Sequence, residues 1–159
     1  MNKSLNPNET LKKYLRRLKI MHFGLVAGML FISLFVYVLQ KNPLSNLPGK
    51  NNTFFYLVPV AALTGYFAGI YIFNKLLNPL ESEQKLSLKL ARYQTASLLH
   101  YTCLEAPALL ALYAYMIQGY LFYAAIAVFL ILYLFAQRPT RVKKVRRIPL
   151  SDQENEALR

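Results

Sequence analysis

The sequence predicts an all-α integral membrane protein with four transmembrane helices arranged as two antiparallel hairpins. Four apolar segments, residues 20–39, 54–74, 93–117 and 120–136, have the length of about 17 to 25 residues at which a helix crosses the hydrocarbon core. None of the four alternates polar and apolar residues as barrel strands do. The chain is 55% hydrophobic, whereas soluble domains average about 45–50%.

Basic residues give the orientation of these predicted spans. They are frequent before residue 20, in residues 75–92 and after residue 137, and scarce in the two other connections. The positive-inside rule therefore predicts that both termini and the middle loop are cytoplasmic. The net charge of +12 would suggest nucleic acid as a partner for a soluble chain. Because the charge here flanks apolar spans, we expect no nucleic-acid partner.

Three segments follow from this pattern. Residues 1–19 predict a basic amphipathic helix, with apolar residues at three- and four-residue spacing. Residues 20–136 form the membrane domain, and we expect residues 20–39 to be a retained span because no small-x-small cleavage site follows them. Residues 137–159 form a basic, then acidic, cytoplasmic tail. Its basic patch, which we expect to attract the anionic cytoplasmic leaflet of the lipid bilayer, consists of Arg138, Arg141, Lys143, Lys144, Arg146 and Arg147.

Two asparagine–proline pairs have the chemistry of helix starts. Asn6 is a predicted N-cap with Pro7 at the first helical position. Asn78 and Pro79 repeat this pattern and predict a second capped helix before the third span. The recurrence leaves two explanations open, an internal duplication or shared helix-start chemistry.

Small residues four apart predict close helix packing. They lie in the first two predicted spans, and such rows let another backbone approach closely. The partner helix belongs either to this chain or to another subunit. The row residues are Gly24, Gly28, Ala61, Gly65 and Gly69.

Glu105 is the only carboxylate within the four apolar segments and lies near the middle of the third. An ionisable group at bilayer depth costs about 3 kcal/mol and marks a functional-site hypothesis. Pro107 has no N–H to donate, so the Cys103 carbonyl loses its helical partner beside the acid. A proton, a water or a sodium ion would suit such a pair. The candidate proton, ion or docking site consists of Glu105, Tyr101, Thr102, Pro107 and Gln94, with Tyr101 and Thr102 as hydrogen-bond donors.

Three interpretations of Glu105 stay open: a structural protonated acid, a proton or cation carrier, and a docking point for a basic residue of another subunit. We expect no catalytic residues, since no nucleophile–base set or phosphate-binding loop occurs. We also expect no metal site and no cofactor. His100 lies about 140° around the helix from Glu105, so the two residues cannot hold one ion.

Residues 89–99, with Arg92, Thr95 and Ala96, and the stretch Leu104-Glu105-Ala106-Pro107-Ala108 resemble a family of small, uncharacterised four-span inner-membrane proteins found mainly in Bacteroidetes-type bacteria. The resemblance implies a bacterial inner-membrane location. The same stretch is similar, more weakly, to the proteolipid c or K subunits of rotary ATPases, which implies an ion-carrying Glu105. This chain lacks their closely spaced glycines and carries its acid in the third span.

The sequence therefore favours a non-enzymatic accessory or structural subunit of an inner-membrane complex or homo-oligomer, with Glu105 buried at a helix or subunit contact. The alternative is an ion- or proton-coupled transporter with Glu105 as carrier. A membrane-protein partner or self-association is expected for the first function.

Overall fold

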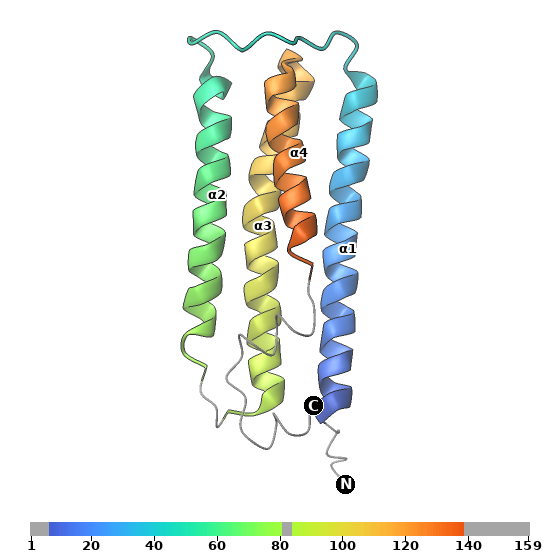
Figure 1. The fold of residues 1–159 in the computed structure, drawn as a ribbon, viewed down its shortest axis with the longest axis vertical. Coiled ribbons are helices and arrows are strands. Elements are labelled where there is room, and N and C mark those ends of the chain that lie inside the picture. Colours follow the sequence, from blue (N-terminus) through green and yellow to red (C-terminus); the bar gives the residue numbers. More distant parts are fainter. Residues whose placement is uncertain (1–6, 81–83, 139–159) are drawn as a thin grey trace.

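The computed structural model describes residues 7–80 and 84–138, with side chains from residue 13 onward. Four helices account for most of these residues: α1 (Pro7–Leu39), α2 (Thr53–Leu77), α3 (Leu86–Gln118) and α4 (Leu121–Ala136) (Figure 1). The described residues contain no strand, so the all-α, four-helix prediction is confirmed. Lys13–Leu39 and Thr53–Leu77 are long and apolar enough to cross a membrane, and α4 is apolar but shorter. Four membrane spans therefore stay a prediction.

The amphipathic segment and the first apolar segment form one continuous helix. α1 begins at Pro7, as expected of a residue whose missing N–H is not needed in the first turn. Leu15 and Leu18 are buried, whereas Arg16 and Arg17 are exposed, so the basic face points away from the bundle. The predicted N-cap, Asn6, lies outside the described residues.

The second predicted helix start is wrong. Asn78 is the C-cap of α2, and its backbone N–H donates to the Asn74 carbonyl. The next helix begins only at Leu86, so Pro79 lies in the connection and ends α2 instead of opening α3. A proline that follows a helix fits a stop signal as well as a start signal, because it cannot continue the preceding hydrogen-bond pattern.

A clasp of backbone and amide hydrogen bonds ties the long α1–α2 connection to the short α3–α4 turn. The Leu44 N–H donates to the Gly119 carbonyl (2.8 Å), and the Leu121 N–H donates to the Leu44 carbonyl (2.9 Å). The side-chain amides of Asn52 and Gln118 pair with each other. Asn52 also caps α2 by accepting from the Phe54 N–H. The connection consequently passes over the end of α3 and α4 (Figure 1).

Gly119 makes the tight α3–α4 hairpin feasible. Its φ of 77° is left-handed, and its N–H donates to the Tyr115 carbonyl. Glycine takes this conformation at a helix C-terminus without the steric cost that a Cβ brings. Only Gly119 and Tyr120 separate the two helices, which confirms the predicted tight turn.

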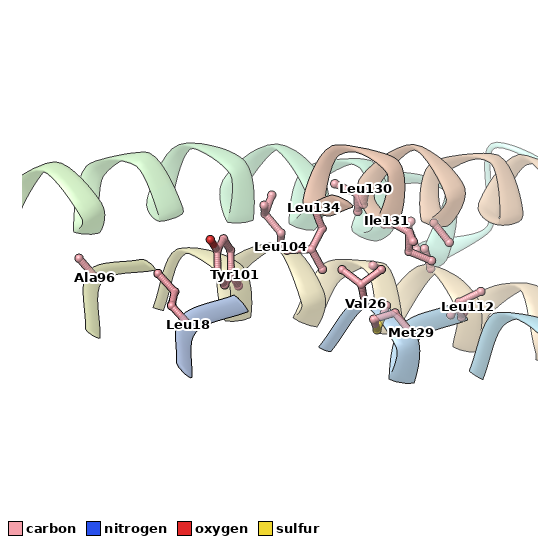
Figure 2. Close-up of a cluster of buried hydrophobic side chains, with 14 of the residues drawn as sticks. Leu18, Val26, Met29, Ala96, Tyr101, Leu104, Leu112, Leu130, Ile131 and Leu134 are labelled. Carbon is pink, nitrogen blue, oxygen red and sulfur yellow. The ribbon is translucent and has the colours of Figure 1, made fainter. Parts of the chain in front are cut away.

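The core lies around α3, which packs against all three other helices. Leu104, Ala108 and Ala111 of α3 are fully or almost fully buried. Figure 2 shows this cluster, in which side chains of α1 and α4 meet those of α3. In a membrane, lipid tails are as apolar as leucine, so close packing rather than exclusion of water stabilises such contacts.

Candidate functional site

Glu105 lies on the outward side of α3 and is half-buried within this chain, so its burial at a subunit contact stays a prediction. The core of α3 includes its immediate neighbour Leu104, whereas Thr102 and Ala106 on either side of Glu105 are exposed. Within this chain the carboxyl group is therefore open to a neighbour.

The two predicted hydrogen-bond donors have other acceptors. The Tyr101 hydroxyl donates to the Gln137 carbonyl just after α4 (3.2 Å), and the Thr102 hydroxyl donates to the Leu98 carbonyl (3.1 Å). Hydroxyls that return to a carbonyl four residues back are common in helices. Neither bond involves Glu105, so the predicted intrachain cluster around the acid is not formed by these donors.

The Cys103 carbonyl, which Pro107 leaves without its helical hydrogen bond, faces a different part of the bundle from Glu105. The Cys103 carbonyl faces Gly65 of α2, at the place where a side chain of Gly65 would stand. Cys103 and Glu105 are two residues apart and point about 160° away from each other around the helix. The Cys103 carbonyl thus faces α2, whereas Glu105 points to another side of α3, and a shared ion site for the two groups stays a prediction. A Cα–H group of Gly65 gives the carbonyl a weak donor.

The two glycine pairs have different surroundings. A Cβ at Gly65 would contact the Cys103 carbonyl and come within 2.9 Å of the Pro107 ring, and one at Gly69 would lie 2.9 Å from Nδ1 of His100. These two glycines therefore let α2 and α3 approach closely, and the half-buried Ala61 lies one turn further along α2. Nothing lies within 4 Å of a Cβ built at Gly24 or at Gly28.

Gly28 and Glu105 belong to one surface, which we call the α1–α3 face. The side-chain amide of Gln94 lies 3.4 Å from the sulfur of Met21, which joins the two helices there. Glu105 is eleven residues after Gln94 on α3, and Gly28 is seven residues after Met21 on α1. Within each of these two pairs, the residues point in the same direction from their helix to within about 20°. The α1–α3 face consists of Met21, Gly28, Gln94, Thr102 and Glu105, whereas Gly24 points about 160° away from His22 and so away from α3.

Gly28 and Glu105 also lie at similar positions along the length of the bundle. The rings of His22 and Tyr101 lie 4.8 Å apart, which gives a second contact between the parallel helices α1 and α3. Counting from either contact at 1.5 Å per residue, Gly28 and Glu105 lie within about 6 Å of each other along the bundle. A helix seated against Gly28 would pass beside the carboxyl group.

A second polar group, missed by the sequence reasoning, lies inside the bundle. His22 is 2% exposed, and among the described residues the only polar group near its ring nitrogens is the backbone of Phe135 in α4, which lies outside good hydrogen-bond geometry. His100 is also buried, and its Nδ1 has no described partner. The two rings flank Tyr101, with centroid distances of 4.8 and 6.3 Å. The available signal was that these are the only two histidines of the chain and both lie in apolar segments.

Two further predictions concern metal binding and the basic tail. The described residues contain no group of three or more His, Cys, Asp or Glu side chains placed to hold a metal ion. Arg138, the first residue of the predicted basic patch, is exposed, and the five others lie outside the described residues.

Comparison with known proteins finds no matching protein-family model, no matching curated protein and no matching solved structure. The candidate function must therefore be argued from the α1–α3 face itself.

Proposed function

We propose that this chain is a non-enzymatic, four-span protein of the bacterial inner membrane that serves as a subunit of a complex or homo-oligomer. The partner would dock on the α1–α3 face. A single observation carries the proposal: the one carboxylate of the apolar segments is half-buried on the same face as Gly28, a glycine that packs against nothing in this chain.

Two physical reasons support a partner helix at this place. A carboxyl group that faces lipid hydrocarbon costs about 3 kcal/mol, and a donor or cation from a neighbouring helix offsets that cost. Glycines four apart form the shallow groove at which membrane helices pack most closely. In this chain Gly65 and Gly69 already have such a neighbour, whereas Gly24 and Gly28 have none.

The Glu105→Gln variant distinguishes an acid that docks a partner from one that carries a proton or cation. A carrier must exchange its proton or cation with both sides, so Glu105→Gln would abolish flux without dispersing the assembly. A glutamate that docks a partner loses that partner when its negative charge, or the proton that it donates in a hydrogen bond, is removed. The proposal and the transporter alternative therefore predict opposite results for the same variant.

The test is affinity purification from the native membrane in mild detergent, followed by mass spectrometry. We expect the wild type to retain a defined partner or a second copy, and Glu105→Gln and Gly28→Leu to lose it. A Cβ at Gly28 meets nothing within 4 Å, so the leucine side chain of Gly28→Leu starts into open space within this chain. Val128→Leu, at an exposed position of α4, is the matched control and should retain the partner.

A wild-type protein that runs as a lone monomer would refute the proposal, as would equal recovery of the partner with all variants. If all variants stay assembled and only Glu105→Gln loses proton flux in liposomes, the carrier alternative replaces the subunit function. Recovery of the protein in the soluble fraction after cell lysis would refute the membrane location itself.

A further inference from the structure

A narrow apolar slot runs between α2 and α4, on a part of the bundle that Glu105 does not reach. Its cavity volume is about 680 Å³. Among the described residues that line it none is charged, and the polar atoms are the hydroxyls of Tyr66 and Tyr133. The lining residues are Pro59, Ala62, Leu63, Tyr66, Phe122, Ala125, Ile126, Phe129, Leu130 and Tyr133.

Aromatic pairs bridge the two helices at both ends of the slot. The rings of Phe55 and Phe122 lie 5.7 Å apart at one end, and those of Tyr66 and Tyr133 lie 5.3 Å apart at the other. The two ends are eleven residues apart on α2 and also on α4. At 1.5 Å per residue the slot is about 16 Å long.

The size and shape of the slot determine which kind of molecule can bind there. An α-helix with side chains is about 10–12 Å across, so a cavity of about 680 Å³ spread over a length of about 16 Å is too narrow to hold one. Alanines at positions 62 and 125 leave the middle of the slot hollow, and the exposed side chains of Leu63 and Phe129 form its rims. A slim, flexible and uncharged chain lying parallel to the helices matches this shape.

We propose that the slot binds one acyl chain of a membrane phospholipid, held between α2 and α4 as a structural lipid. The inference rests on the membrane insertion proposed above, but not on the partner at the α1–α3 face. Contact with an unbranched hydrocarbon fills the hollow that the helices leave, which restores the dispersion contacts that an empty cavity lacks. The aromatic pairs fix the two ends of the bound segment.

The test uses the full chain reconstituted with a phosphatidylcholine whose acyl chain carries a diazirine near its middle. After illumination, peptide mass spectrometry gives the labelled fraction at each residue. We expect several-fold more label at Leu63 and Phe129 than at Phe31, an equally exposed residue of α1 outside the slot. Ala125→Phe should fill the slot and reduce that excess several-fold, and Val128→Phe, on the same helix but outside the slot, should not.

Even labelling of all exposed residues would overturn the proposal, as would an excess that Ala125→Phe leaves unchanged. Ala62→Phe fills the slot from the other helix and replaces Ala125→Phe if that variant loses its helical circular dichroism. Protection of both rims together with a disulfide-linked dimer of Phe129→Cys in a Cys103→Ser background would show a second copy as the occupant. Flotation with lipid vesicles separates the two proposals, because a chain that fails to float refutes insertion before any labelling.

Discussion

The difference between the two glycine pairs gives the sharpest prediction of stability. Alanine at Gly65 would place a methyl group against the Cys103 carbonyl and 2.9 Å from the Pro107 ring, so backbone would have to move. Alanine at Gly28 would meet nothing within 4 Å. Both substitutions gain the same intrinsic helix propensity, about 1 kcal/mol. The difference between the two variants therefore measures packing alone.

Overpacking of a close contact costs about 1–3 kcal/mol. We expect Gly65→Ala to have a free energy of unfolding lower than that of Gly28→Ala by this amount. Gly69→Ala should lie between the two, because the nearest atom to its Cβ is Nδ1 of the His100 side chain, which can rotate, and not backbone.

The assay is unfolding of each purified variant in mixed detergent micelles by titration with sodium dodecyl sulfate, followed by circular dichroism. Equal free energies for Gly65→Ala and Gly28→Ala would refute the close α2–α3 approach. A larger loss at Gly28 than at Gly65 would show that the open glycines carry the tighter contact, and hence that the partner of α1 remains bound in micelles.

Three further variants test the clasp and the end of α4 by the same titration. Gly119→Ala should lose about 1–2 kcal/mol, because L-residues are strained at its φ of 77°; an unchanged free energy would contradict the left-handed turn. Asn52→Ala should lose about 1–2 kcal/mol because it removes both an N-cap and the amide pair; a loss no larger than that of an exposed loop asparagine would show that the clasp is dispensable. Tyr101→Phe should lose about 1 kcal/mol by removing the hydrogen bond to the Gln137 carbonyl, and no change would mean that water replaces it.

The sequence predicted which segments are helical better than which side of each helix is buried. Length and apolar composition suffice to predict four helices, and Gly119 predicts the hairpin turn. The Asn78–Pro79 pair misled because the same residues suit the end of one helix and the start of another. Only the position of Leu86, where α3 begins, distinguishes the two, and that position depends on the packing of the whole bundle.

The sequence identified residues of the candidate site but not the directions in which their side chains point. Glu105 was identifiable as the one acid in apolar surroundings, yet its direction depends on which side of α3 the other three helices cover. Tyr101 was assigned to Glu105 because both lie on one stripe of α3, whereas α4 ends next to Tyr101 and offers the Gln137 carbonyl. Contacts between helices far apart in sequence decide such pairings, and no local spacing contains them.

The clasp has a consequence for biosynthesis. The Leu44 backbone pairs with Gly119 and Leu121, which are synthesised some seventy-five residues later. The connection after α1 therefore stays without these hydrogen bonds until the α3–α4 turn has been synthesised and has packed against it. A ribosome-bound chain that ends before residue 119 would carry both early helices without these bonds, so truncated chains should be degraded faster than the full chain.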